Sequence, residues 1–259
     1  MPRALPLSLA ALALVVGCTG PGDDVSTAAA DTAATADAVP PVRVEPLADG
    51  VWMHTSYERI GGAAVPSHGL IVRTGDTVLL VDTGWNDDQT AEILDWADAH
   101  DLTVTEAVLT HAHSDKMGGV PALKARGVRT FAHNLANEDA PARGLEPAET
   151  GLFLNPGDSS MVWSGVEVMY PGAGHTRGNL VLGIRGQGIV FGGCLIRPGD
   201  ATDLGNTADA DVPEWAASAE RVGWRFEDAG TIVPSHGDPG GRDLIAHTVA
   251  LAKKAAATR

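Results

Sequence analysis

The sequence has few cysteines, few basic residues and no long apolar run, and each shortage excludes a class of protein. Two cysteines in 259 residues cannot form a disulfide framework. Eighteen Lys and Arg against 33 Asp and Glu give a formal net charge of −15. This balance argues against a nucleic-acid-binding protein, which needs a cationic face. Because 44% of the residues are hydrophobic, most of the chain can still fold around a core.

The longest apolar run lies at the beginning of the chain. Arg3 is followed by apolar residues 5–16, then by Gly17 and Cys18. A positive start, an apolar stretch too short to span a membrane and a small residue before a cleavage site indicate an export signal. A cysteine at this position resembles a bacterial lipoprotein signal, with an ordinary secretory peptide as the alternative. We therefore expect a lipoprotein-type signal at 1–18, a periplasmic or cell-envelope protein, and membrane contact only through a lipid on Cys18.

The next stretch, residues 19–41, is rich in Ala, Thr, Asp and Pro and contains no aromatic residue. Such a composition cannot bury enough apolar surface to order itself, so we predict a flexible tether. Residues 42–259 keep 17 basic and 29 acidic residues, a formal charge of −12, and contain every histidine. We predict one monomeric folded domain over this range.

The domain reads as several strands followed by mixed strands and helices, a pattern that then recurs. Residues 42–46 and 51–55 predict one hairpin, and a Gly-rich segment at 60–66 separates it from a second at 69–73 and 78–82. Asn86 is expected to cap a helix that extends through His100. Further strands are expected at 107–110, 166–170, 180–184, 189–192 and 231–234, and further helices at 121–126, 214–226 and 244–254. This order predicts an α/β protein of stacked sheets covered by helices.

Four of the nine histidines follow predicted strands directly. His111 and His113 lie in the segment HAHSD, where Asp115 follows two residues later; His175 ends PGAGH, and His236 lies in VPSHG. A single histidine in such a loop is more often a hydrogen-bonded turn residue. Four of them at strand ends, one in an H-x-H-x-D pattern, indicate a metal site instead.

Cys194 is the only cysteine left after the predicted processing. A free thiol in an oxidising compartment is a liability unless something occupies it, although a small buried apolar residue is the ordinary alternative. Zinc ligation explains both the thiol and the histidines. We assign one zinc to His111, His113 and His175, leaving a position for water, and a second to Asp115, Cys194 and His236. Open positions make the pair catalytic rather than structural.

The segments that carry these ligands resemble one known family. HAHSDKMGG, PGAGHT, GGCLIR, GNTADAD and VPSHG, in this order and spacing, are similar to the subclass B1 metallo-β-lactamases, with the New Delhi and Verona types most similar. The resemblance covers residues 42 to about 255. It implies a four-layer αβ/βα sandwich with two zinc ions at the edge between its sheets.

Two residues separate this resemblance from other hydrolases with the same scaffold. Lactonase-, glyoxalase- and ribonuclease-like members usually have a second histidine where this chain has Lys116. They also usually have a bridging aspartate where it has Cys194. Both differences favour the β-lactamase branch.

The resemblance implies zinc-dependent hydrolysis of penicillins, cephalosporins and carbapenems, with resistance to these antibiotics. Zinc-bound water ionises near pH 7, and the hydroxide, oriented by Asp115, would attack the lactam carbonyl without a covalent enzyme intermediate. Asn206 would donate to the developing oxyanion, a role worth up to about 10²–10³ in rate, or it is only a turn residue. Arg197 stands where many relatives bind the substrate carboxylate through lysine.

Some positions differ from the family. Gly178 stands where an aspartate is usual, which puts the support of His175 in doubt, and His68 stands where asparagine is common. The segment 58–66 aligns with a mobile flap but lacks an aromatic tip, so we expect a weaker apolar grip on bulky substrates. We expect Asp82 to lie under the site and Trp85 to form a wall of the pocket or fill the core. We assign the remaining histidines to packing or surface (His54, His100, His133 and His247).

Two other functions stay open at this point. Another hydrolase of the same fold, such as a lactonase or thioesterase, is disfavoured by Lys116 and Cys194. A zinc-binding lipoprotein without enzyme activity is disfavoured by Asn206 and Arg197, because a metal store needs neither an oxyanion donor nor a carboxylate clamp.

Overall fold

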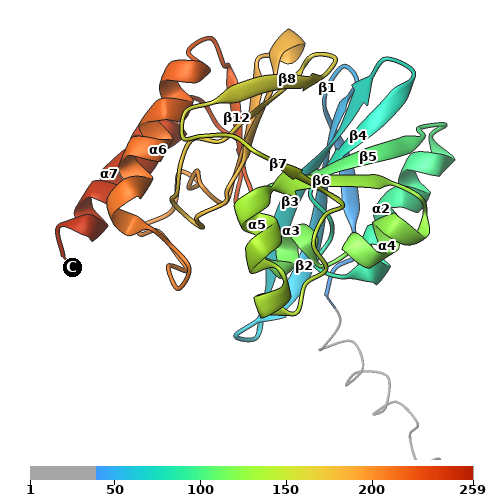
Figure 1. The fold of residues 1–259 in the computed structure, drawn as a ribbon, viewed down its shortest axis with the longest axis horizontal. Helices are drawn as coiled ribbons and strands as arrows, with labels where there is room; N and C mark the ends of the chain where they lie inside the picture. The colour runs from blue at the N-terminus through green and yellow to red at the C-terminus, as the bar shows by residue number, and fades with distance from the viewer. Residues whose placement is uncertain (1–38, 259) are drawn as a thin grey trace, which may run out of the picture. The chain divides into compact units, whose positions relative to one another are not determined.

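The computed structural model describes residues 39–258, which form two β-sheets with helices on both outer faces (Figure 1). The predicted export signal at 1–18 and most of the predicted tether at 19–41 lie outside the described residues. Within the described part, no helix is both long and apolar enough to cross a bilayer.

The first sheet has seven strands in the order β1-β2-β3-β4-β5-β6-β7. Strands β1 to β4 pair antiparallel, whereas β4 to β7 run parallel. The strands are β1 Arg43–Ala48, β2 Val51–Ile60, β3 Ala63–Thr74, β4 Thr77–Val81, β5 Val104–Leu109, β6 Arg129–His133 and β7 Thr150–Leu152. The helices of this half are α2 Asp87–Ala99, α3 Ser114–Met117, α4 Val120–Ala125, α5 Asn134–Asp139 and the 3₁₀ turn η1 Pro141–Arg143.

The second sheet has five strands in the order β12-β11-β10-β9-β8. Only β11 and β12 are parallel. The elements are β8 Ser159–Trp163, β9 Val166–Met169, β10 Val181–Ile184, η2 Arg185–Gln187, β11 Ile189–Gly193, α6 Val212–Arg225, β12 Thr231–Pro234 and α7 Asp243–Ala256. Helices α6 and α7 lie side by side on the outer face of this sheet (Figure 1).

Side chains that alternate between the two faces of the central strands form the apolar layers of the fold. In β4, Leu80 packs outward against α2 and α4, whereas Leu79 and Val81 point to the second sheet, because successive side chains of a strand face opposite sides. On the far side, Trp215 and its neighbours on α6 and α7 cover the second sheet. The result is the predicted αβ/βα sandwich, with three apolar layers between its four layers of secondary structure.

Most predicted elements are confirmed, including both hairpins and the helix capped by Asn86, whose side chain accepts from the Gln89 N–H. The prediction that residues 60–66 separate the two hairpins is wrong. Strands β2 and β3 continue through it and turn only at Gly61 and Gly62, whose positive φ angles of 59° and 86° suit glycine. The sequence patterns also did not predict the strands β6, β7 and β8 or the helices α3 and α5.

Candidate metal centre and cavity

The predicted ligands lie where strands end, on the loops at one edge of both sheets. His111 follows β5, Cys194 follows β11 and His236 follows β12, while His175 lies on the loop between β9 and β10. The carboxyl ends of parallel strands are where open α/β sheets bind ligands. The fold therefore brings together residues that are up to 125 positions apart, such as His111 and His236.

Three imidazoles form the first cluster. His113 Nδ1 lies 3.1 Å from His111 Nε2 and 3.0 Å from His175 Nε2. His113 Nε2–H donates to the Asp209 carboxylate at 2.9 Å, because a carboxylate can only accept, and this leaves Nδ1 as a lone pair. Thr110 Oγ1 donates its proton to Asp82, so it can only accept from His111 Nδ1–H, which lies 3.2 Å away. Nε2 of His111 therefore carries a lone pair.

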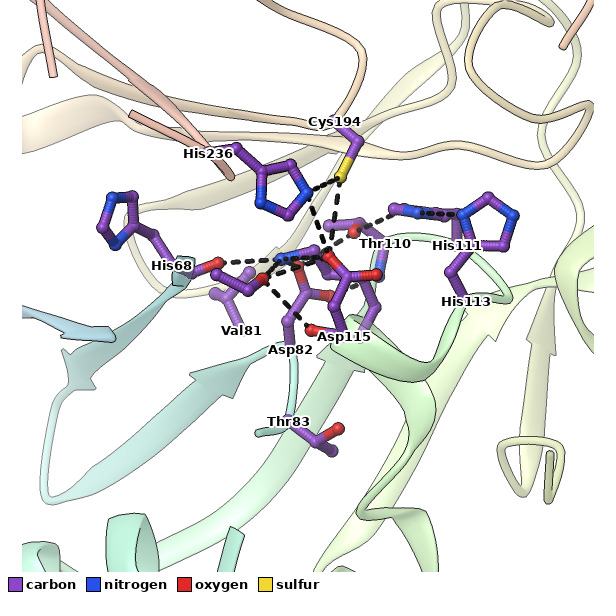
Figure 2. Close-up of polar contacts among 12 residues, drawn as sticks. His68, Val81, Asp82, Thr83, Thr110, His111, His113, Asp115, Cys194 and His236 are labelled. Carbon is purple, nitrogen blue, oxygen red and sulfur yellow. Dashed lines mark hydrogen bonds and ion pairs between the residues drawn. The ribbon is translucent and has the colours of Figure 1, made fainter. Parts of the chain in front are cut away.

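A thiol, a carboxylate and an imidazole form the second cluster. Figure 2 shows Cys194 and His236 pointing toward Asp115: Cys194 Sγ lies 3.4 Å from His236 Nε2 and 3.7 Å from Asp115 Oδ2. His236 Nε2 lies 3.5 Å from the same carboxylate oxygen. The Nδ1–H of His236 donates to the Pro66 carbonyl at 2.6 Å, so Nε2 offers a lone pair to the cluster. His111 also has a ligand atom within 4.8 Å of those of Asp115 and Cys194.

A buried ammonium supports the second cluster from below. Lys116 is fully buried, and its Nζ lies 3.3 Å from Asp115 Oδ2 and 3.6 Å from Asp82 Oδ2. It donates to Ser67 Oγ at 2.7 Å and to the His68 carbonyl at 2.9 Å. Burial alone would raise the pKa of Asp115, but the charge of Lys116, together with the three histidines around the carboxylate, outweighs it and holds that pKa well below its usual value. Burial raises the pKa of Asp82 to about 7.

Asp82 lies under the site, as predicted, with its carboxylate 3.6 Å from Lys116 Nζ, and its backbone is strained. It has φ of 62°, a left-handed conformation that is rare for a residue other than glycine. Its carboxylate accepts from the Thr110 backbone N–H at 2.6 Å and from Thr110 Oγ1 at 2.9 Å (Figure 2). The strained residue therefore anchors the start of the loop that carries His111 and His113.

In both clusters the ligand atoms are arranged to hold a metal cation rather than to hydrogen-bond with one another. In the first, three imidazole lone pairs converge, an arrangement in which no proton is shared but a cation would be held. Burial lowers the pKa of His175 to about 3 and that of His111 well below its usual value, so both rings are neutral ligands. In the second, burial raises the pKa of the Cys194 thiol, which a bound cation would reverse. Imidazole and thiolate are the donors that zinc prefers.

A cavity of about 500 Å³ opens over both clusters. Trp85, Ile60, Val65 and Leu145 supply apolar walls, and the ring of Trp85 lies 6.3 Å from that of His236. Trp85 thus forms a wall of the pocket, one of its two predicted roles. The other lining residues are polar or belong to the clusters: His113, Ser114, Asp115, Arg143, His175, Asn206 and His236.

The two predicted substrate-binding residues are placed differently. Asn206 lines the cavity, and its Oδ1 accepts from the Ala208 N–H at 3.1 Å, so it has a turn role as well. Arg197 is half-buried, donates through Nε to the Asp203 carbonyl at 3.2 Å and packs under Gly205. It is not one of the residues that line the cavity in the described structure.

The two other departures from the family have a structural basis. A side chain at Gly178 would meet the Ala136 backbone nitrogen at 2.6 Å, so the site has no room for one. His175 Nδ1 is buried without a hydrogen-bond partner among the described residues, consistent with the predicted loss of support. His68 Nδ1 pairs with Thr55 Oγ1 at 2.9 Å, and its backbone N–H donates to the Ser235 carbonyl at 2.8 Å.

Two residues of the site were not predicted from the sequence. Asp209 binds His113, and Arg143 ion-pairs with Asp209 at 2.9 Å. Asp209 lies within the GNTADAD segment, which was the available signal, but nothing in the sequence around Arg143 marks it.

The histidines assigned to packing or surface lie away from both clusters. His54 and His133 are buried, and the ring of His133 packs against that of Tyr170 at a tilt of 32°, with ring centroids 4.1 Å apart. His100 stacks on Trp96, and His247 pairs with the Ala201 carbonyl.

Comparisons with known proteins agree with this geometry. Residues 62–236 match the family model described as the Metallo-beta-lactamase superfamily. A Bacillus cereus protein named Metallo-beta-lactamase type 2 is 37% identical over 213 residues, which cover 82% of this chain and 83% of the relative. Among solved structures, the metallo-beta-lactamase FIM-1 from Pseudomonas aeruginosa, in a mono-zinc form, has a TM-score of 0.81 and 48% identity, covering 84% of this chain and 97% of that one. A metallo beta lactamase from Hirschia baltica has a TM-score of 0.80 and 43% identity, with coverage of 82% and 98%.

Proposed function

Because the chain belongs to the metallo-beta-lactamase superfamily, we propose that it is a β-lactamase that hydrolyses the amide bond of penicillins, cephalosporins and carbapenems and so confers resistance to them. One observation carries the proposal. Two adjacent clusters of ligand atoms, one of three imidazoles and one of carboxylate, thiol and imidazole, lie at the floor of a single cavity of about 500 Å³.

The proposal includes two zinc ions per chain. His111, His113 and His175 would hold one, and Asp115, Cys194 and His236 the other. When bound, zinc polarises a carbonyl group and lowers the pKa of water toward neutrality.

Asp115 is the residue of this chain best placed to manage a proton. Lys116 keeps its carboxylate ionised, and Ser67 Oγ donates to its Oδ2 at 3.0 Å, which fixes the orientation of the group. Asp115 lines the cavity, so its carboxylate can accept a hydrogen bond from a water molecule and orient it toward the lactam carbonyl. Direct attack by water needs no covalent intermediate with the enzyme.

The rest of the cavity supplies binding and charge stabilisation. The amide nitrogen of Asn206 is not used by its turn, so it can donate to the oxygen on which negative charge develops. Trp85, Val65 and Leu145 pack against the substrate and exclude water. Arg197 would need to leave its place under Gly205 to bind the substrate carboxylate. Without an aromatic residue at the tip of the β2–β3 hairpin, we expect a high KM for substrates with bulky side chains.

The direct test is hydrolysis of a carbapenem and a chromogenic cephalosporin by the full chain, measured with added zinc, with a chelator, and after zinc is returned. Native mass spectrometry of the same samples counts zinc per chain. Turnover that disappears with the chelator and returns with two bound zinc ions supports the proposal. The variant Asn206→Ala should lose about 10²–10³ in kcat while it retains both ions.

The same assay separates the alternatives. A zinc-loaded chain that cleaves lactones or thioesters but no β-lactam is another hydrolase of this fold. A chain that binds zinc and cleaves none of these substrates is a metal-binding protein. Either result overturns the proposal.

We also propose that the protein is exported and lipidated at Cys18, on the strength of the apolar run 5–16 and the Gly17-Cys18 pair. Cell fractionation of the full chain should place it in the membrane fraction, and Cys18→Ala should move it to the soluble periplasmic fraction. Cytoplasmic protein with an intact N-terminus would refute export.

A further inference from the structure

Arg143 lies at the mouth of the cavity with its guanidinium already engaged. Its Nη2 lies 2.9 Å from Asp209 Oδ1, its Nε donates to Asp209 Oδ2 at 3.4 Å, and its Nη1 lies 3.4 Å from an oxygen of Asp139. Two carboxylates therefore neutralise a cation that lines the cavity. Two-point contacts of this kind hold a carboxylate in a defined orientation as well as at a defined distance.

The carboxylate so held is the one that binds His113. Asp209 Oδ2 accepts from His113 Nε2–H at 2.9 Å, and that hydrogen bond sets both the tautomer and the rotation of the ring.

The pair also connects two parts of the chain that enclose the cavity. Arg143 ends the turn η1 between α5 and β7, and Gly144 follows with φ of 72°, a left-handed conformation that turns the chain back toward Leu145. Asp209 lies between β11 and α6, on the same loop as Asn206. The ion pair therefore joins the turn that carries Leu145 to the loop that carries Asn206, and both of these residues line the cavity.

We propose that Arg143 is a positioning residue of this site: through Asp209 it holds His113 with Nδ1 directed at the other two imidazoles, and it fixes the loop that carries Asn206. The expected effect on catalysis rests on the proposed function, whereas the expected effect on metal retention does not. The opposite role, a cation that binds an anionic substrate group, is disfavoured because all three guanidinium nitrogens of Arg143 already face a carboxylate of Asp209 or Asp139.

The test uses the full zinc-loaded chain and the variants Arg143→Gln, Arg143→Lys and Asp209→Asn. Arg177→Gln is the matched control, because Arg177 belongs to the same charged cluster but pairs with Asp139 and Glu138 rather than with Asp209. Three quantities are measured: the rate of zinc release to an excess of chelator, the solvent exchange of the His113 Nε2 proton by ¹⁵N-histidine NMR, and kcat and KM for a chromogenic cephalosporin.

Loss of a group that orients a metal-ligating histidine costs roughly 10- to 100-fold in metal affinity, and Arg143 acts one residue further away. We therefore expect Arg143→Gln to release zinc about 10-fold faster, to expose the His113 proton to faster exchange and to lower kcat. Arg143→Lys should recover part of each effect, Asp209→Asn should match or exceed Arg143→Gln, and the control should stay within about twofold of the parent chain.

A rise in KM for Arg143→Gln, with unchanged zinc release and unchanged proton exchange, would make Arg143 a substrate-binding residue and overturn the inference. If the parent chain cleaves no β-lactam while zinc release and proton exchange change as expected, the proposed function fails and the positioning role stands. Should Arg143→Gln not fold, the same two readouts on Arg143→Lys and Asp209→Asn decide, because both retain a polar side chain of similar size.

Discussion

Replacing Lys116 by methionine should destabilise the zinc-free protein strongly. The ammonium is fully buried, and its three N–H groups face Ser67 Oγ, the His68 carbonyl and Asp115 Oδ2. Methionine has a similar length but offers neither charge nor donor. Asp115 and Asp82 would then remain buried without their shared cation.

The magnitude follows from breaking a buried ion pair on one side, which costs about 3–5 kcal/mol because the remaining charge is left uncompensated. For a domain of this size, that loss corresponds to a fall in Tm of roughly 6–20 °C. The cost should grow as the pH rises above 7. Burial already raises the pKa of Asp82 to about 7 with Lys116 present. Without the ammonium this pKa rises further, so the carboxyl of Asp82 stays neutral in the folded variant near pH 7. At higher pH the unfolded chain releases the proton more readily than the folded chain, and the variant loses stability relative to the parent.

The assay is urea denaturation of the full zinc-free chain at pH 6, 7 and 8, followed by tryptophan fluorescence and by circular dichroism. Lys124→Met is the control, because Lys124 pairs with Glu146 at 2.6 Å on the surface, where such pairs contribute about 0–1 kcal/mol. A zinc-loaded series measures how far bound metal restores the variant.

A Lys116→Met chain within about 1 kcal/mol of the parent at every pH, as expected only for a surface pair, would refute the reasoning. It would mean that Asp82 and Asp115 are both protonated or both hydrated, and that the ammonium does not hold the carboxylate of Asp115 in its ionised form.

Two further substitutions test the framework of the site. Burial opposes ionisation of Glu167, but its hydrogen bonds with Ser159 and two arginines lower its pKa below the usual 4.5. Glu167→Gln should therefore cost about 1.5–3 kcal/mol at pH 7, because the arginines left behind are partly exposed, and the difference from the parent should shrink as the pH falls below 4.5, as acid denaturation curves will show. Gly69→Ala should cost about 3 kcal/mol in urea denaturation, because its Cβ would lie 2.2 Å from His54 Nε2, whereas Gly186→Ala, in open space, should stay within about 0.5 kcal/mol. Equal stability of the two alanine variants would contradict the packing argument.

The ligand residues could be found from the sequence because each follows a strand that is readable by itself. Runs such as Ala107–Thr110 and Thr231–Pro234 are apolar and β-branched, and a ligand histidine follows each of them within two residues. His111, Cys194 and His236 could therefore be assigned to one edge of the fold before any coordinates were known.

The β2–β3 hairpin shows where local patterns fail. Its glycines and alanines indicate a flexible connection, yet the backbone pairs from Tyr57 with Pro66 through to Ile60 with Ala63. Hydrogen bonds between two strands depend on the partner strand and not on the propensity of either one. The edge strand β8 was missed for the same reason, since its exposed residues show no apolar alternation.

The family, the layered α/β architecture, the six metal-ligand candidates and the place of Asn206 near them could all be predicted before the fold was known. Those features rest on short-range patterns and on motifs whose order and spacing are visible in the linear chain. The surroundings of these residues became apparent in the folded protein: the burial of Lys116 between two carboxylates, the place of Arg197 outside the cavity lining, and the pairing of Arg143 with Asp209. The Lys116–Asp82 and Arg143–Asp209 contacts join residues 34 and 66 positions apart, and the place of Arg197 depends on the shape of a cavity. Charge complementarity at such separations acts through space, and the sequence carries no local signal for it.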